Sequence, residues 1–146
     1  MDLSREPIVI LIAFFIGAVW GSFLNVLIYR LPKEISIVKD PPSSCPSCGT
    51  PIRWFDNIPI LAWLALRGRC RTCSNKISIR YPLVEAAAGC LSVLALLRWG
   101  LTLTGFEVMV FSWVSLALCL IDFDHQILPN VLTYPSIVFG LVCSLL

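Results

Sequence analysis

Four cysteines form two Cys-x-x-Cys pairs in the first half of the chain, Cys45 with Cys48 and Cys70 with Cys73. Each pair can direct two sulfurs at one ion, and two pairs complete a tetrahedral S4 site of the kind that binds structural Zn²⁺. Two disulfides or a redox-active dithiol are the alternatives, but no thioredoxin-like sequence surrounds either pair. Because the set contains no other ligand type and no open position, the pattern predicts a structural zinc site and not a catalytic one.

Two aspartates near the end of the sequence form a second candidate site. Asp122 and Asp124 directly follow an apolar run, and acidic residues at a membrane boundary are functional candidates because they are costly there. The alternative, that they only mark a helix end in the headgroup region, stays open on spacing alone. Their separation of two residues does not place both on one helix face, so we do not expect them to act as a pair. His125 is the only histidine, so no metal site is expected here.

Composition indicates that the elements carrying these residues lie in a membrane. Hydrophobic residues make up 58% of the 146 residues and charged residues 14%, with a mean hydropathy of +0.85. Soluble domains are about 25% charged. We therefore predict an all-α polytopic membrane protein with about four transmembrane helices. The expected spans are 7–28, 81–97, 106–121 and 127–146, the last broken by Pro129 and Pro135. Only Arg5 is basic ahead of the first span and no Ala-x-Ala site follows it, which disfavours a cleaved signal peptide.

Polar and small residues inside the expected spans predict helix contacts. Gly17, Gly21 and Ser22 offer a small-residue face for close packing of the first helix. Asn25 requires a partner on another helix, because a buried amide needs a hydrogen bond. Glu85 is expected in the first turn of the second span, where a carboxylate favours the helix N-terminus. The single cysteines within apolar runs are expected to pack as small hydrophobic residues: Cys90, Cys119 and Cys143.

Residues 29–80 separate the first two spans and hold nine of the eleven basic residues. The positive-inside rule therefore predicts that this loop is cytoplasmic and that the N-terminus is external. Five basic residues stand close to the cysteines and would offset the charge of about −2 on Zn²⁺ with four thiolates: Arg53, Arg67, Arg69, Arg71 and Lys76. Residues 58–66 are apolar but too short to cross a bilayer. They form either the core of the zinc module or a segment on the membrane interface, and we favour the interface.

A series of motifs runs in order along nearly the whole chain. They are Gly21-Ser22-Phe23-Leu24-Asn25-Val26, Tyr29-Arg30-Leu31-Pro32, the two cysteine pairs with Asp56-Asn57-Ile58-Pro59 between them, Arg80-Tyr81-Pro82-Leu83-Val84-Glu85, and Leu120-Ile121-Asp122-Phe123-Asp124-His125-Gln126-Ile127-Leu128-Pro129. Together they resemble the type IV prepilin leader peptidase and N-methyltransferase family. The resemblance implies a bifunctional enzyme of the bacterial inner membrane. It would remove the basic leader of prepilins or pseudopilins, the substrates of type IV pili and type II secretion, and methylate the new N-terminus with S-adenosylmethionine.

The resemblance also implies an intramembrane aspartic protease, and it assigns the role of one catalytic aspartate to Asp122. The family's second aspartate lies in a Gly-x-Gly-Asp motif further along the chain. Two carboxylates that share a proton have split pKa values, so one can activate water while the other protonates the carbonyl oxygen or leaving amine. A carboxylate at the membrane boundary can reach a leader whose charged part stays in the cytosol while its apolar helix remains in lipid.

Two departures from the family pattern limit the expected activity. No Gly-x-Gly-Asp occurs in this sequence, and the family's rear helices are absent. We therefore expect the front part of the enzyme, either a fragment or one half of a split enzyme, in which 81–146 begins a truncated peptidase domain. Such a chain would not cleave prepilin alone, and a missing rear half would supply the second aspartate. The family usually has Leu-Pro-Asp where this chain has Leu128-Pro129-Asn130, so an acidic role at Asn130 is in doubt.

The resemblance associates methyl transfer with the cysteine loop, 29–80. No glycine-rich nucleotide loop follows a strand, so a Rossmann-type site is not predicted and the contacts of S-adenosylmethionine stay unassigned. A second hypothesis is a membrane-anchored zinc-ribbon adaptor without catalysis, which binds protein or nucleic acid through the basic loop. The aromatic residues of the loop do not form a stacking platform, so the expected partners are prepilins and the lipid bilayer and not nucleic acid.

Overall fold

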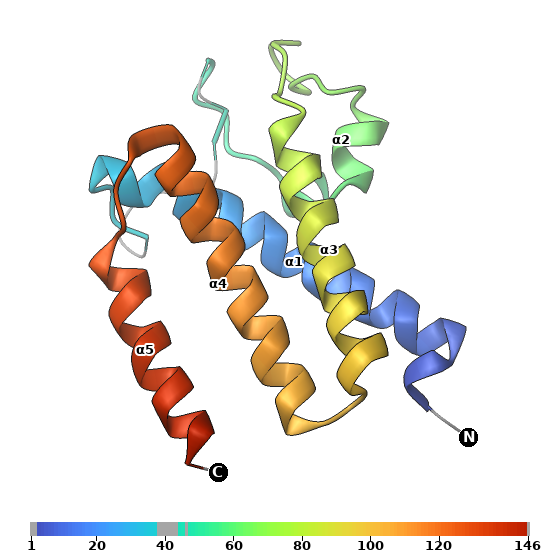
Figure 1. Cartoon of the computed structure of the whole chain (residues 1–146). Helices are drawn as coiled ribbons and strands as arrows, with labels where there is room; N and C mark the ends of the chain where they lie inside the picture. Colours follow the sequence, from blue (N-terminus) through green and yellow to red (C-terminus); the bar gives the residue numbers. More distant parts are fainter. Residues whose placement is uncertain (1–2, 38–43, 46, 146) are drawn as a thin grey trace.

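The computed structural model describes residues 3–37, 44–45 and 47–145, so 38–43 and residue 46 of the expected cysteine loop lie outside the described residues. Within the described ranges all elements are helical and the only β-structure is two isolated bridges, which confirms the predicted all-α class. The helices are α1 (Pro7–Arg30), α2 (Leu61–Ala65), α3 (Arg80–Trp99), α4 (Leu103–His125) and α5 (Asn130–Ser144). Short 3-10 turns cover Leu3–Arg5, Leu31–Lys33 and Trp54–Asn57. Figure 1 shows α3 and α4 as an antiparallel pair that α1 crosses, with α5 beside α4.

Three helical segments are long and apolar enough to cross a membrane: Pro7–Lys33, Arg80–Trp99 and Leu103–His125. They coincide with the first three expected spans and extend each by a few residues. At 1.5 Å per residue, the 15 residues of α5 reach about 22 Å, which is short of the roughly 30 Å of a hydrocarbon core. Pro135 lies inside this helix without ending it, and Pro129 stands at its N-cap.

Helices α1 and α3 approach each other until their backbones touch, because small residues face one another. A Cβ on Gly17 would collide with Ser92 Oγ and come within 2.8 Å of Gly89 Cα. A Cβ on Gly21 would lie 2.7 Å from Glu85 Cα. The predicted small-residue face of the first helix is therefore confirmed at both glycines.

Helix α4 completes the core through one large aromatic side chain. Trp113, only 4% exposed, stacks on Trp20 at 5.3 Å between ring centroids, and its indole N–H donates to Ser92 Oγ at 3.0 Å. Asn25 is also buried, and its amide donates to the Tyr81 carbonyl of α3 at 3.1 Å. The expectation that this amide has a partner on another helix is confirmed.

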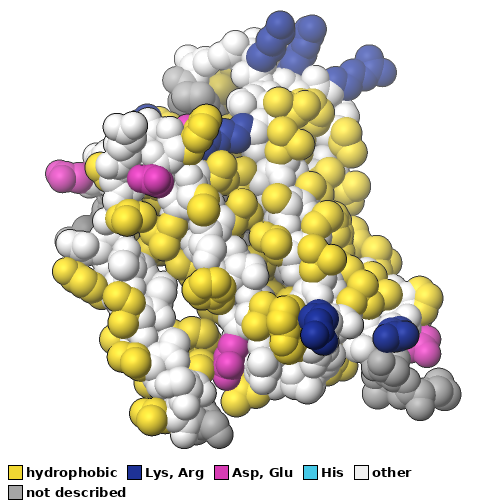
Figure 2. Space-filling view, in the orientation of Figure 1, with side chains coloured by type: hydrophobic (Ala, Val, Ile, Leu, Met, Phe, Trp, Pro, Cys, Tyr) yellow, Lys and Arg dark blue, Asp and Glu magenta, His cyan; other side chains and the backbone are white. Residues whose placement is uncertain are grey.

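Two sequence-based placements are wrong. Glu85 was expected in the first turn of the second span, but it lies in the second turn of α3, where it is 8% exposed and accepts a hydrogen bond from outside the helix. Cys90 and Cys119 are not buried but lie on the outer surfaces of α3 and α4. This outer surface is largely apolar along the helices, as Figure 2 shows, so cysteine is compatible with it.

Candidate functional site

The first Cys-x-x-Cys pair forms a tight turn closed by backbone hydrogen bonds. Gly49 N donates to the Cys45 carbonyl at 2.9 Å, and Cys45 N donates to the Thr50 carbonyl at 3.0 Å. The chain reverses at Gly49 with φ +69, a left-handed conformation that glycine adopts at little cost. This geometry points Cys45 and Cys48 to the same side of the turn.

The second pair repeats the same construction. Ser74 N donates to the Cys70 carbonyl at 3.0 Å, and Cys70 N donates to the Asn75 carbonyl at 2.8 Å. Ser74 has φ +57 and corresponds to Gly49 of the first turn. In both turns the residue directly after the second cysteine therefore takes the left-handed conformation that reverses the chain.

The two turns bring the four predicted ligands together. The sulfurs of Cys45, Cys48, Cys70 and Cys73 all lie within 4.8 Å of one another, and Cys45 Sγ is 3.7 Å from Cys73 Sγ. A tetrahedral ion with metal–sulfur bonds of about 2.3 Å would separate its sulfurs by about 3.8 Å. All seven cysteines are free, so the disulfide alternative is not realised. The donor set therefore fits a tetrahedral thiophilic metal ion such as Zn²⁺.

Electrostatics within the cluster also favour a cation. The Thr50 hydroxyl, 3.3 Å from Cys48 Sγ, and the Thr50 backbone together lower the pKa of Cys48 to about 6. For Cys73 the Asn75 backbone lowers the pKa, but desolvation and the neighbouring sulfurs outweigh it and raise the pKa to about 11. Four thiols so close together oppose one another's ionisation, and a bound divalent cation removes that opposition.

An ion pair between Arg71 and Asp56, which the sequence did not predict, lies beside the cysteine cluster. Arg71 donates from Nε to Asp56 Oδ2 at 2.9 Å and from Nη2 to Asp56 Oδ1 at 2.6 Å. The hydrogen bond from the guanidinium lowers the pKa of Asp56, and the carboxylate in turn raises the pKa of Arg71. The pair joins the Trp54–Asn57 turn to the second knuckle. Its only signal in the sequence is an isolated acid within a basic loop.

Both aspartates of the second candidate site lie in the last turn of α4, but their surroundings differ. Asp124 Oδ2 is 2.6 Å from Arg80 Nη1, and Arg80 Nη2 also reaches the Leu120 carbonyl at 3.5 Å. Asp122 is exposed, and its carboxylate has no hydrogen-bond or ion-pair partner among the residues that the structure describes. Asp122 therefore keeps both carboxylate oxygens available to water or a ligand, whereas Arg80 engages one oxygen of Asp124.

Two protein-family models match this chain. Residues 15–99 match the model of the bacterial Peptidase A24 N-terminal domain, and residues 109–146 match the model of the type IV leader peptidase family. The chain belongs to the type IV prepilin leader peptidase family. No solved structure matches it significantly.

Several curated leader peptidases align with nearly all of this chain. A prepilin leader peptidase/N-methyltransferase of Myxococcus xanthus is 45% identical over 94% of this chain and 41% of the relative. One from Pseudomonas putida is 38% identical over 97% of this chain and 57% of the relative. A type 4 prepilin-like proteins leader peptide-processing enzyme of Escherichia coli is 41% identical over 88% of this chain and 54% of the relative. The chain spans about half the length of the curated relatives it matches.

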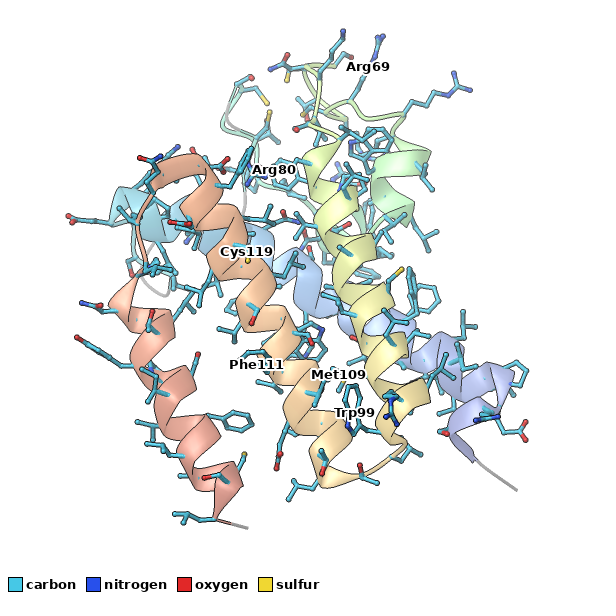
Figure 3. All side chains as sticks on the ribbon, viewed as in Figure 1. Arg69, Arg80, Trp99, Met109, Phe111 and Cys119 are labelled. Carbon is cyan, nitrogen blue, oxygen red and sulfur yellow. The ribbon has the colours of Figure 1, made fainter. Side chains whose placement is uncertain are left out.

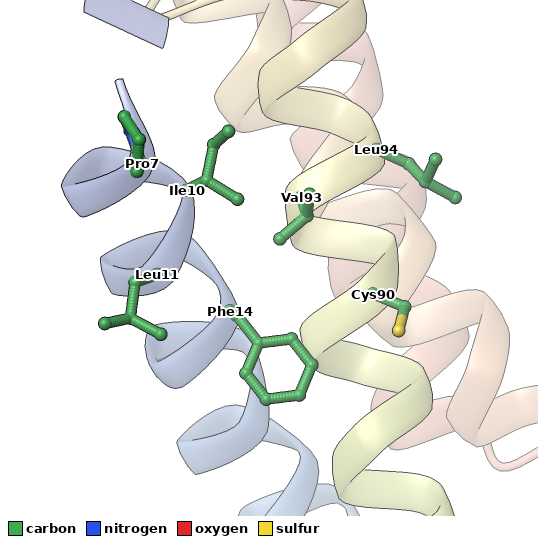
Figure 4. A pocket seen from close by; sticks show the side chains of 7 residues that line it. All are labelled: Pro7, Ile10, Leu11, Phe14, Cys90, Val93 and Leu94. Atoms are coloured by element: carbon green, nitrogen blue, oxygen red, sulfur yellow. The ribbon is translucent and has the colours of Figure 1, made fainter. Parts of the chain in front are cut away.

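In this leader peptidase family member both candidate sites lie at the same end of the helical bundle. The loop that carries the cysteines and the C-terminal end of α4 are both at the top of Figure 1. Arg69 of the loop and Arg80 at the start of α3 mark this end in Figure 3. A shallow hollow between α1 and α3, lined by Leu11, Phe14, Leu94 and other apolar side chains (Figure 4), carries no catalytic group beyond the lone thiol of Cys90.

Proposed function

We propose that this chain forms the front part of a prepilin leader peptidase and N-methyltransferase of the bacterial inner membrane. It would cleave the leader of prepilins or pseudopilins on the cytoplasmic side and take part in S-adenosylmethionine-dependent methylation of the new N-terminus. The observation that carries the proposal is the unpartnered Asp122 carboxylate at the end of a membrane-length helix, on the same end of the bundle as the cysteine loop.

Asp122 is the catalytic aspartate in this proposal. Its neighbour Asp124 is engaged by Arg80 at 2.6 Å, so Asp124 positions the end of α4 and does not take part in chemistry. An aspartic mechanism needs a second carboxylate to hold the shared proton. The sequence contains no Gly-x-Gly-Asp, so that carboxylate would come from a further polypeptide segment packed against α4.

The cytoplasmic placement of the loop rests on its charge. Basic residues concentrate in 29–80, and short basic loops remain in the cytoplasm. The substrate's basic leader would then meet Asp122 at the cytoplasmic boundary, while its apolar helix stays in lipid. The N-terminus of this chain would be external.

The four cysteines would hold Zn²⁺ as a structural ion. When bound, the ion supplies a charge that keeps four thiolates together and so fixes the fold of the loop. Residues 29–80 would then form part of the methyl-transfer site, on the basis of family resemblance and of their place beside the Asp122 end of the bundle.

The decisive test changes Asp122 and compares it with its neighbour. The chain is co-expressed with a polypeptide that supplies the Gly-x-Gly-Asp segment, in cells lacking their own prepilin peptidase, and prepilin shortening is followed on gels. Asp122→Asn should abolish cleavage, because Asn can neither accept nor donate the proton, whereas Asp124→Asn should retain it in part. Normal cleavage by Asp122→Asn would contradict the proposal and favour the non-catalytic zinc-ribbon adaptor.

A further inference from the structure

The short helix α2 lies deeper along the bundle than its place in the loop suggests. Ile60, at its N-cap, donates its backbone N–H to Glu85 Oε2 at 2.7 Å. Glu85 is five residues beyond Arg80, the first residue of α3, and so lies about 7 Å along that helix. Helix α3 has 20 residues and a length of about 30 Å, which matches a hydrocarbon core. The start of α2 therefore sits at the depth of the headgroup and acyl-chain boundary.

A strained turn directs the chain into this position. Ile60 has φ 61 and ψ −51, a conformation that β-branched residues rarely adopt, and Leu61 N lies 2.5 Å from the Pro59 carbonyl. Such strain persists only where the surroundings hold it. The buried Glu85 carboxylate holds one side of the turn, and the indole N–H of Trp63 donates to the Ile77 carbonyl at 3.1 Å on the other.

The outward face of α2 is apolar. Ala62 is buried, whereas Leu61 and Leu64 are 52% and 57% exposed. Trp54, in the preceding 3-10 turn, is 81% exposed, and Leu83 on the first turns of α3 is 59% exposed. Figure 2 shows apolar side chains both in this region and further down along α3. Because α3 is long enough to cross a membrane, the apolar face of α2 continues the surface that α3 presents to lipid.

Basic side chains border this face on the side away from the bundle. Arg67, Arg69 and Lys76 are exposed. Dark blue groups at the top of Figure 2 project beyond the apolar surface, and Figure 3 labels Arg69 at this end. Arg71 is already engaged by Asp56. An apolar face at interfacial depth with basic residues above it is complementary to the headgroup region of an anionic bilayer.

We propose that α2 and its flanking arginines anchor the cysteine loop on the bilayer by binding anionic phospholipid headgroups. This inference rests on the proposed membrane-spanning role of α3. The anchor holds the cysteine cluster against the membrane surface, where the new N-terminus of a pilin whose apolar helix stays in lipid would emerge. Glu85 is the positioning residue that sets the depth of the anchor.

Photocrosslinking of the full chain tests the anchor. The photoreactive residue p-benzoylphenylalanine is placed singly at Leu64, at Leu94 or at Thr72, and each purified chain is reconstituted in vesicles. Leu94 is 60% exposed in the middle of α3, and Thr72 is exposed between Cys70 and Cys73. The vesicles contain either phosphatidylcholine alone or equal parts of phosphatidylcholine and phosphatidylglycerol, and lipid adducts are measured by mass spectrometry.

Lipid adducts are expected at Leu64 and Leu94 but not at Thr72. The yield at Leu64 should fall several-fold in phosphatidylcholine alone or when Arg67→Gln and Arg69→Gln are combined, while the yield at Leu94 stays constant. Adducts at Leu94 without adducts at Leu64 would overturn the anchor and leave the membrane-spanning role of α3 intact. Absence of adducts at both positions would overturn the anchor and the membrane-spanning role of α3. A Leu64 adduct to a second copy of the chain would overturn the lipid anchor and show that this face binds protein.

Discussion

The helical bundle and the cysteine loop are stabilised by different means. In the bundle, α1 and α3 meet backbone to backbone at Gly17 and Gly21, and α4 adds buried apolar side chains such as Ile121. Among the described residues 44–79 few side chains are buried; they are those of Cys45, Pro59 and Ala62. A segment with so little core depends on cross-links. Here these are the cysteine cluster, the ion pair between Arg71 and Asp56, and the hydrogen bond from Ile60 N to Glu85. Damage to one region should therefore spare the other.

Substitution of a metal ligand should give the largest difference between the effects on the loop and on the bundle. Cys70→Ser should reduce bound zinc from about one per chain to nearly none, because one of four thiolates is lost. The loop should then become sensitive to trypsin, while the helical circular dichroism of the bundle is kept. Cys90→Ser is the matched control, since Cys90 is a lone cysteine exposed on α3. Unchanged zinc in Cys70→Ser would mean that the S4 site is wrong.

The reverse experiment damages the bundle. Gly21→Leu places side-chain atoms where a Cβ alone would lie 2.7 Å from Glu85 Cα, so α1 and α3 must separate. Overpacking of this kind costs about 1–3 kcal/mol or more, measured as thermal unfolding in detergent. Gly140→Leu should be nearly neutral, because no atom lies within 4 Å of a Cβ at that position. Equal effects of the two substitutions would contradict the close α1–α3 contact.

A third substitution removes the hydrogen bond from Ile60 N to Glu85, which links the loop to the bundle. Glu85→Ala leaves the Ile60 N–H without its acceptor, a loss of about 1–3 kcal/mol. Trypsin should then cleave after Arg67 and Arg69 faster than in the unchanged chain. Glu85→Gln keeps a side-chain oxygen acceptor and should restore most of the protection. Should Glu85→Ala resist trypsin as well as Glu85→Gln does, this hydrogen bond does not hold the loop.

The smallest effect is expected at the partly exposed pair between Arg80 and Asp124. Asp124→Asn should lower the stability of the bundle by about 0.2–1 kcal/mol, as measured by unfolding, because solvent screens partly exposed ion pairs. The loss should shrink at high salt, since added ions already weaken the pair in the unchanged chain. A loss that is independent of salt would show that Asp124 acts through packing and not through charge.

Part of this architecture could be predicted from local patterns. The three long spans follow from apolar length, and the sulfur cluster follows from the spacing of two identical turns whose closing residues, Gly49 and Ser74, are adjacent to the cysteines. Asn25 was expected to need a partner, although only the structure identifies it as the Tyr81 carbonyl. Each of these features depends on residues that are close together in the sequence, or on the requirement that a helix in a membrane be apolar and satisfy its buried polar groups.

The position of Glu85 shows where local reasoning fails. A carboxylate near the start of a helix is ordinarily expected to interact with the positive end of the helix dipole. Here a segment 25 residues earlier in the chain reaches Glu85 and uses it as an acceptor, at a turn whose backbone conformation local preferences disfavour. The pairing of Arg80 with Asp124 is likewise one of several pairings that the charges near the span ends allow.

The sequence by itself determined that three helices are long and apolar enough to cross a membrane, that four cysteines form a cluster able to hold a metal ion, and the family of the chain. Apolar length, cysteine spacing and ordered motifs are properties of short segments. Only the tertiary structure decided which aspartate of α4 is paired and which is unpartnered, and how deep α2 lies along α3. These features depend on contacts between distant segments, and their geometry exists only once the small residues of α1 and α3 have brought the helices together.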